Sequence, residues 1–284
     1  MTREKAAITL CADDYGLAPG LGVAIRALIE QGRLQATGCM TGSAHWPDEA
    51  MKLKPLEGRA EFGVHLTLTD HRPLGAMPSL APEGRLPPIG AMVKRSVLRR
   101  LDKAEIAAEL ERQVDAFEAH MGRPPDFLDG HHHIHQLPII RDVVVDLWHR
   151  RLKQRGGWVR SCWENPLAIV RRGVDPVRAT IIALLGIGLR MRMRAGGIPH
   201  NRSFRGVYDF SGKVAYAELF RIFTEAPGPG TLVMCHPGQV DDALRACEWL
   251  TDQREVEWRF LESDACALSL ADRSITLIPR PIPA

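Results

Sequence analysis

Paired cysteines and a leader segment are the first features that this sequence lacks. Its six cysteines are scattered without any C-x-x-C spacing, at Cys11, Cys39, Cys162, Cys235, Cys247 and Cys266. This scatter argues against a thiol-based zinc site. The apolar stretch Ala6 to Leu10 comes too early and is too short for a signal peptide. We therefore expect a cytoplasmic protein with free thiols in a reducing setting.

Strong charge of one sign is missing as well. The 37 basic and 34 acidic residues leave a net charge of +3 over 284 residues. A domain that binds nucleic acid usually clusters its basic residues on one face. We therefore expect no nucleic-acid partner. The hydrophobic fraction of 45% and the charged fraction of 25% are those of an ordinary globular protein.

Long hydrophobic runs are also absent. The most apolar stretch, Ala179 to Leu189, has 11 residues, whereas a helix needs about 20 to cross a bilayer. The stretch has basic flanks that suit a helix lying on a membrane surface: Arg178, Arg190, Arg192 and Arg194. A packed helix with a basic end is the preferred interpretation, so peripheral membrane contact stays an alternative. The sequence leaves open whether the protein forms a homodimer.

What the sequence does contain is an alternation of strand and helix patterns. Short apolar runs predict strands at Ala6–Cys11, Gln35–Met40, Glu61–Leu68, Asp126–Leu128, Gly157–Arg160, Thr231–Met234 and Ser274–Ile278. Helical spacing of apolar residues predicts helices at Gly20–Glu30, Asp48–Leu53, Lys103–Met121, Ile139–Leu152 and Ala215–Phe223. Such alternation favours a mainly parallel sheet with crossover helices. We therefore predict an α/β fold, a distorted (β/α) barrel similar to a TIM barrel.

The chain shows no internal division, because neither a linker nor a repeat interrupts it. Residues 1–284 are therefore expected to form a single domain. The stretch Thr69 to Arg99 lacks a regular pattern and carries five prolines: Pro73, Pro78, Pro82, Pro87 and Pro88. A loop of this length in a compact domain is usually a lid or a substrate-binding segment. We expect an insertion of this kind at about residues 69–99.

Two adjacent acids, Asp13 and Asp14, stand one residue beyond the first predicted strand. One of them could cap the next helix while the other is solvated. The alternative is a division of labour, in which one carboxylate binds a cation and the other accepts a proton from water on that cation. Such water has a pKa of about 7, so a nearby carboxylate would be an adequate base.

Histidines gather near the ends of two further predicted strands. Four lie within five positions, at His131, His132, His133 and His135, and His65 lies near the end of the third strand. Neutral imidazole is the commonest metal ligand, and further histidines can orient the ligands by hydrogen bonding. On extended backbone His131, His133 and His135 would share one face, but the spacing does not show which of them binds. A solvated polar loop, and a hydrogen-bonded core histidine at position 65, are the alternatives.

Two more candidates, Arg160 and His236, also lie at predicted strand ends. His236 could be a general acid, or only a residue of the turn that follows. Arg160 could pair with Asp13 and keep it ionised, or be an ordinary surface arginine. Each candidate is ambiguous alone. Together they fall at the carboxyl ends of strands, where α/β barrels place their active sites.

Four segments, taken together, resemble the YdjC-like carbohydrate deacetylases, which include chitooligosaccharide deacetylases and hopanoid-associated deacetylases. The segments are Ala12-Asp13-Asp14-Tyr15-Gly16-Leu17, Gly63-Val64-His65-Leu66-Thr67-Leu68, Asp129 to Pro138 with the histidine cluster, and Cys235-His236-Pro237-Gly238. The resemblance runs in order from about residue 6 to 262. It implies a distorted (β/α) barrel with one divalent metal ion bound by Asp14, His65 and His131.

The same resemblance implies a reaction and further roles. The reaction is hydrolysis of an N-acetyl group from an amino sugar, in an oligosaccharide or a glycolipid, by water that the metal activates. Asp13 matches the base, His236 the acid and, more weakly, Arg160 a further catalytic residue. We assign His133, His135 and Tyr15 to the support of these groups or to substrate contacts. Magnesium or zinc is the expected ion, although the ligand types also suit iron, cobalt and nickel, and magnesium prefers oxygen.

Two other functions stay open. Two histidines and one carboxylate also bind Fe(II) in non-haem oxygenases, but the extra acid Asp13 and the alternating α/β pattern argue against that class. A carbohydrate-binding protein without turnover is the second alternative. The basic and apolar segment Arg171 to Asn201 leaves room for a lipid-linked or a polymeric substrate.

Overall fold

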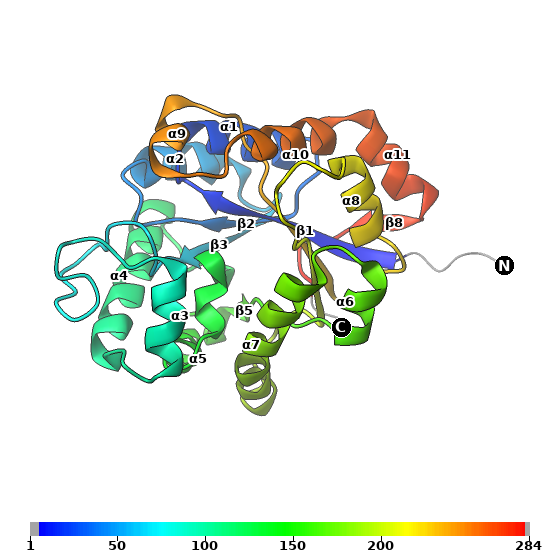
Figure 1. Ribbon diagram of the computed structural model, residues 1–284. Helices are drawn as coiled ribbons and strands as arrows, with labels where there is room; N and C mark the ends of the chain where they lie inside the picture. The colour runs from blue at the N-terminus through cyan, green and yellow to red at the C-terminus, as the bar shows by residue number, and fades with distance from the viewer. Residues whose placement is uncertain (1–5, 282–284) are drawn as a thin grey trace.

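The computed structural model describes residues 6–281, and its strands form one parallel sheet. The strands are β1 (Ala6–Tyr15), β2 (Ala36–Cys39), β3 (Glu61–Leu66), β4 (Phe127–Gly130), β5 (Trp158–Val159), β6 (Ser203–Arg205), β7 (Thr231–Cys235) and β8 (Ile275–Leu277). Their order is β5-β4-β3-β2-β1-β7-β6, and β8 pairs with the first residues of β1. The sheet curls inside a ring of helices (Figure 1). The predicted α/β fold, a distorted (β/α) barrel with parallel strands, is confirmed.

Helices connect the strands and cover the outside of the sheet. They are α1 (Pro19–Glu30), α2 (Trp46–Leu53), α3 (Ile89–Val97), α4 (Lys103–Met121), α5 (Ile140–Arg151), α6 (Pro166–Arg172), α7 (Pro176–Ala195), α8 (Tyr216–Phe223), α9 (Asp242–Cys247), α10 (Asp252–Glu262) and α11 (Asp264–Asp272). Short 3-10 turns occur at η1 (Lys54–Leu56), η2 (His131–Gln136) and η3 (Lys153–Arg155). Helix α4 has the predicted bounds because its ends are marked: the Asp102 side chain caps its first turn, and Gly122 (φ 75°) ends it in the left-handed conformation.

The stretch 69–99 is less irregular than the sequence suggested. Its last third forms α3, which begins after Pro88 and buries Met92 and Ser96. All five prolines of the stretch precede this helix, and proline is well tolerated at a helix start. The short strand β6 and the helices α6, α9, α10 and α11 were also not predicted.

Two sets of buried side chains lie on the two faces of the sheet. In β1, Ile8, Leu10 and Ala12 belong to the large core under the helices, whereas Cys11 belongs to a smaller cluster with Phe127, Trp158 and Leu232. This alternation is that of a strand with both faces buried. The smaller cluster fills the inside of the curled sheet below the carboxyl ends of the strands.

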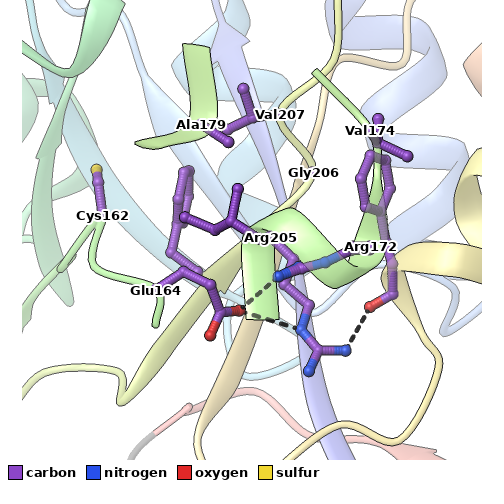
Figure 2. Close-up of a pocket in the computed structure, with 11 residues that line it drawn as sticks. Cys162, Glu164, Arg172, Val174, Ala179, Arg205, Gly206 and Val207 are labelled. Atoms are coloured by element: carbon purple, nitrogen blue, oxygen red, sulfur yellow. Dashed lines mark hydrogen bonds and ion pairs between the residues drawn. The ribbon is translucent and has the colours of Figure 1, made fainter. Parts of the chain in front are cut away.

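Helices α6 and α7 form a pair beside the open edge of the sheet. Below α6, Glu164 lies between two arginines, with its Oε2 3.2 Å from Arg172 and 3.3 Å from Arg205 (Figure 2). Arg172 thus points inward from α6. Helix α7 packs on α5 and η2 and buries Ala183 and Leu189 among others.

All six cysteines are free thiols, as predicted, and Cys247 is the exposed one. In residues 6–281, no helix combines the length and the apolar character that crossing a membrane requires.

Candidate active site

Six of the predicted site residues converge at the carboxyl ends of the strands. Two lie at the end of β1, one at the end of β3, and one each just after β4, β5 and β7: Asp13, Asp14, His65, His131, Arg160 and His236. All of these side chains are buried except that of His236, which is 12% exposed. The curl of the sheet therefore brings together residues that are up to 223 positions apart in the chain.

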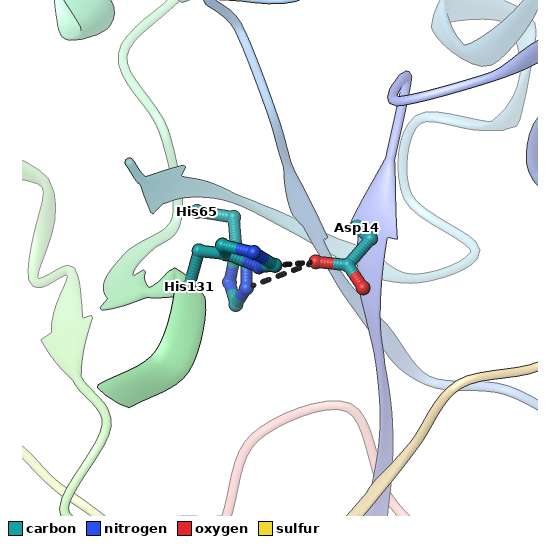
Figure 3. A group of neighbouring side chains, drawn as sticks. All are labelled: Asp14, His65 and His131. Atoms are coloured by element: carbon teal, nitrogen blue, oxygen red, sulfur yellow. Dashed lines mark hydrogen bonds and ion pairs between the residues drawn. The ribbon is translucent and has the colours of Figure 1, made fainter. Parts of the chain in front are cut away.

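Asp14 lies at the centre of the closest group. Its Oδ1 is 2.9 Å from His131 Nδ1 and 3.3 Å from His65 Nε2. One ligand atom from each of the three residues lies within 4.8 Å of the others. Figure 3 shows both rings directed at the same carboxylate oxygen. Zinc binds nitrogen and oxygen at about 2.0–2.2 Å, so ligand atoms this close together can share one cation.

A backbone irregularity at the end of β1 puts both acids into the site. In a regular strand neighbouring side chains point to opposite faces. Between Ala12 and Tyr15, however, the register of β1 against β2 shifts, and Asp14 has a φ of 68°. Aspartate tolerates this left-handed conformation better than most residues. As a result Asp13 and Asp14 both line the same cavity.

Asp129 holds His65 from the side opposite to Asp14. Asp129 Oδ1 lies 2.8 Å from His65 Nδ1, an arrangement that fixes the orientation of metal-binding histidines. Burial alone would lower the pKa of His65, but the negative charges of Asp129 and Asp13 outweigh it and raise that pKa to about 10. Gly38 leaves room for this pair, because a Cβ there would lie 2.9 Å from His65 Nδ1.

Arg160 is completely buried between two carboxylates. It donates from Nη1 to Asp13 Oδ2 at 2.8 Å and from Nη2 to Asp13 Oδ1 at 2.5 Å, and Nη2 also lies 2.6 Å from Asp129 Oδ2. The alternative of a surface arginine is therefore wrong. Burial would raise the pKa of Asp13, but the charge of Arg160 holds that pKa well below its usual range. Asp13 is consequently an ionised carboxylate.

A second arginine, Arg254 of α10, contacts the other side of Asp14. Its Nη2 donates to Asp14 Oδ2 at 2.6 Å, and its Nε donates to the carbonyl oxygen of Leu250. Burial would raise the pKa of Asp14, but Arg254 and His131 together hold it well below the usual range. Arg254 thus binds one carboxylate oxygen and leaves the other to His65 and His131.

The histidine cluster forms a tight turn instead of an extended strand. Residues His131–Gln136 form η2, in which His132 and His133 have φ values of 53° and 58°. The expected common face of His131, His133 and His135 is therefore wrong, because the chain leaves the sheet immediately after Gly130. The turn sends each imidazole into a different environment.

The three remaining histidines of the cluster, His132, His133 and His135, differ in their surroundings. His132 and His133 line the cavity, and His132 Nδ1 lies 3.0 Å from Thr69 Oγ1 at the start of the long loop. His135 is buried behind the cavity, with Nε2 3.0 Å from the carbonyl oxygen of Arg160. His135 therefore supports Arg160, whereas His133 is placed to contact a bound molecule.

Tyr15 lies behind the site. Its hydroxyl donates to the carbonyl oxygen of Glu49 at 2.8 Å and accepts from Arg26 at 2.8 Å. It is fully buried and is not one of the residues that line the cavity. This position gives no support to a substrate contact by Tyr15. The side chain instead holds α2 against the end of β1.

His236 faces the ionised carboxylate of Asp13. The two residues approach to 4.0 Å, from Nε2 to Oδ2. The backbone N–H of His236 donates to Glu257 of α10 at 2.6 Å, which fixes the turn after β7. Burial lowers the pKa of His236 to about 4 in spite of the nearby charge of Asp13. The imidazole is therefore neutral at neutral pH.

A cavity of about 700 Å³ lies over these residues. Its floor is polar and contains Asp13, Asp14, His65, His131 and His236. One wall is aliphatic and comes mainly from α3 and α7, with Ile89, Val93, Leu137, Ile181, Ile182 and Leu185. Phe210 and Trp249 add aromatic surface. The cavity thus suits a ligand that has both a polar and an apolar part.

The residues present fit a divalent cation. The donor set of one carboxylate and two imidazoles is a common one for such ions, and His65 Nε2 and His131 Nδ1 face the same oxygen of Asp14. Cys11, Asp13 and Asp129 form another group of close ligand atoms. The guanidinium of Arg160 already neutralises that group, so Asp14, His65 and His131 are the better candidates.

A profile of the YdjC-like protein family matches residues 7–272. The chain belongs to this family. The resemblance noted in the sequence is therefore confirmed, and it now covers almost the whole chain. Within this YdjC-like chain, the segments that carried the resemblance supply five of the six converging site residues, and Arg160 is the exception.

Curated relatives of this YdjC-like chain carry an enzyme name. Chitooligosaccharide deacetylases of Yersinia pestis (strain Pestoides F) and Yersinia pseudotuberculosis (serotype O:1b, strain IP 31758) are 39% identical to it over 136 residues. The match covers 47% of this chain and 52% of each relative. The chain thus spans about half the length of the curated relatives that it matches.

Solved structures share the fold at low sequence identity. A protein of Enterococcus faecalis V583 named for cellobiose-phosphate cleavage has a TM-score of 0.73 and 18% identity, and the alignment covers 97% of both chains. A peptidoglycan N-acetylglucosamine deacetylase has a TM-score of 0.51 and 11% identity, over 97% of this chain and 87% of that one. At these identities the likeness supports the distorted barrel alone.

Two residues at the centre of the site were not assigned from the sequence. Asp129 stands in the segment that carries the histidine cluster, and its position at the end of β4 could have marked it as a partner for a neighbouring strand. Arg254 offers no local signal, since it lies within a helix near the end of the chain. Only the folding of α10 over the end of β1 brings it to Asp14.

Proposed function

We propose that this protein is a metal-dependent hydrolase that removes an N-acetyl group from an amino sugar. The observation that carries the proposal is the convergence of Asp14, His65 and His131 beside the ionised Asp13 and the neutral His236. The family and the named activity of the half-length curated relatives support the same reaction. The metal ligands and the catalytic roles are part of the proposal.

Each side chain has a defined task in this scheme. A divalent cation held by Asp14, His65 and His131 would polarise the amide carbonyl and make water more acidic. Asp13, kept ionised by Arg160, accepts the proton of the attacking water at Oδ2. His236 lies 4.0 Å from that oxygen; its neutral imidazole receives this proton at Nε2 and passes it on to the departing amine. The products are acetate and the free amino sugar.

The donor set narrows the choice of ion. One carboxylate and two imidazoles suit zinc and its transition-metal neighbours, whereas magnesium is usually bound through oxygen ligands and water. Of the two ions expected from the sequence and the resemblance, zinc therefore fits the described side chains better.

The cavity favours a glycolipid over a purely polar oligosaccharide. A sugar alone would leave the aliphatic wall of the cavity exposed to water. This wall is formed by Ile89, Val93 and the α7 residues Ile181, Ile182 and Leu185. An apolar group attached to the amino sugar would cover this wall and gain about 25 cal/mol for each Å² removed from water.

An acetate-release screen tests the proposal directly. The full chain would be loaded in turn with zinc, cobalt, nickel and magnesium and given N-acetylglucosamine oligomers and N-acetylated glycolipids. We expect acetate release with at least one ion, and faster release from glycolipids. Oxygen consumption coupled to turnover with bound iron would instead indicate a non-haem oxygenase. Calorimetric sugar binding without acetate release at any metal loading would indicate a binding protein.

A further inference from the structure

We infer that the outer face of α6 and α7 docks on an anionic lipid bilayer. This face, here the α6–α7 face, consists of seven exposed apolar side chains: Leu167, Val170, Val177, Ile181, Leu184, Ile187 and Met191. Their exposed fractions run from 37% to 70%. Nothing in residues 6–281 covers them, and a patch of this kind on two consecutive helices marks an interaction surface.

The apolar residues of α7 form a stripe with helical spacing. Val177, Ile181, Leu184 and Met191 recur at steps of four, three and seven, which places them on one side of an α-helix. The buried residues of α7 lie on the opposite side, with Ala183, Gly186, Leu189 and Met193. Helix α7 is therefore apolar on two faces, although packing within the protein uses only one of them.

The positive charge around the α6–α7 face indicates an anionic partner. Residues 166–202 carry seven arginines and a single acid, Asp175, a net charge of +6, whereas the whole chain carries +3. The rest of the chain is thus net negative. Three of these seven arginines pair with acids of the same chain, and within residues 6–281 four make no ion pair: Arg171, Arg190, Arg194 and Arg202. At about 100° per residue, Arg178 and Arg192 lie on one side of the stripe and Arg190 and Arg194 on the other. Apolar residues between basic flanks are the pattern of a helix lying in an anionic membrane interface.

The packing below α6 fixes which face looks outward. Arg172 points inward to Glu164, which also binds Arg205 (Figure 2). Separating these buried charges would be costly, because one of them would be left buried without its partner. They hold α6 so that Leu167 and Val170 face solvent, beside the stripe of α7.

A second copy of the chain is a poorer partner for this face. A twofold dimer brings the same surface of both copies together, and here it would bring the arginines of α7 against each other. Two of the acids near them, Asp175 and Asp142, already pair with Arg178 and Arg192 of the same chain. An anionic bilayer has no such conflict, because its headgroups supply the missing negative charge.

The docked face adjoins the cavity. Ile181 belongs to the exposed stripe and also lines the cavity. Three residues of the neighbouring face of α7 line the cavity too: Arg178, Ile182 and Leu185. Docking through the α6–α7 face would therefore bring the cavity close to the membrane surface.

Vesicle flotation with the full chain tests this inference. We expect binding to vesicles of phosphatidylcholine with phosphatidylglycerol, weak binding to phosphatidylcholine alone, and loss of binding as salt is raised. The triple variant Val177→Ser, Leu184→Ser, Met191→Ser should bind at least about tenfold more weakly. The matched control, Met51→Ser with Leu268→Ser, changes side chains that are 64% and 62% exposed elsewhere and should bind like the unchanged chain.

A charge variant gives an independent arm of the test. Within residues 6–281, the side chains of Arg171 and Arg194 make no ion pair, so Arg171→Glu with Arg194→Glu should fold normally. An arginine near an anionic surface contributes about a fivefold factor in binding, and both changes together should weaken binding at least about 25-fold. Absence of vesicle binding by the unchanged chain, or binding that neither variant weakens, would overturn the inference. So would a lipid-free dimer in sedimentation velocity that the serine variant converts to a monomer.

Discussion

Asp13 and Asp14 are neighbours in sequence but differ in their surroundings. Asp13 is bound by both terminal nitrogens of Arg160, and Asp14 is shared among His65, His131 and Arg254. Two adjacent carboxylates would repel each other if they were not neutralised separately. The two arginines would therefore allow Asp13 to stay ionised as the proposed base while Asp14 holds the proposed cation.

The role of Asp13 can be tested by removing only its charge. Asp13→Asn keeps the shape of the side chain and should lower acetate release by about 10²- to 10⁴-fold, because general base catalysis contributes a factor of this size. Metal content, measured by elemental analysis, should not change. Retained activity would show that Asp13 is not the base, and lost metal would show that it is a ligand.

Changing one of the proposed metal ligands should impair metal binding more than changing Asp129, which contacts the ligand His65. His65→Ala and His131→Ala should each abolish stoichiometric metal binding. Asp129→Asn should weaken metal affinity by only about 10- to 100-fold, since it acts through the orientation of His65. Competition titration with a chromophoric chelator measures all three. Full metal occupancy in either histidine variant would contradict the ligand assignment.

The proposed acid can be separated from the base by its kinetics. His236→Ala should slow acetate release by about 10²- to 10⁴-fold on an amide substrate. On an acetate ester of a good leaving group the loss should be much smaller, because such a group departs without a proton. Equal losses on both substrates would argue for a structural role of His236.

At the scale of elements, the sequence located the site but not the turns that shape it. The strand ends at Asp13, His65 and His131 were predictable from short apolar runs followed by polar residues. The left-handed conformations of Asp14 and His132 were not. They depend on tertiary contacts, namely the register shift of β1 against β2 and the packing of η2, and local propensity carries no information about these.

Helix α10 should make the stability of the protein depend on pH through Glu257. Burial raises the pKa of Glu257 to about 7, although hydrogen bonds from Tyr208 and from the N–H of His236 oppose this. The folded state then holds a proton that the unfolded state releases near pH 4.5. The contribution of Glu257 to the free energy of unfolding is therefore largest below about pH 4.5, and this contribution is lost as the pH rises to about 7.

Glu257→Gln should remove that dependence. Urea unfolding between pH 5 and 7 should show a fall in the free energy of unfolding of up to about 3 kcal/mol in the unchanged chain and a smaller fall in the variant. Glu255→Gln, which changes a partly exposed acid of the same helix, is the matched control. An identical slope in all three proteins would show that Glu257 does not hold a proton.

At the scale of the whole molecule, alternation of strands and helices was enough to predict the barrel, whereas contacts between its distant parts were not predictable. Arg254 reaches Asp14 across 240 positions of sequence, and no spacing rule links them. Helix α3 was not predicted, because the prolines that precede it made the whole stretch 69–99 look irregular. The order of the strands, which sets the neighbours of each site residue, follows from packing and not from any single segment.

Metal binding should therefore be visible in the stability of the entire chain, since the proposed ligands come from β1, β3 and the turn after β4. A ligand at 100 times its dissociation constant stabilises the folded state by about 2.7 kcal/mol, which corresponds to a rise in Tm of roughly 5 °C for a chain of this size. Calorimetry of the chelator-treated protein with and without added zinc should show this rise. His65→Ala should abolish it, and His149→Ala, which removes an exposed histidine of α5, should not. An equal rise in His65→Ala would mean that zinc stabilises the fold from another place.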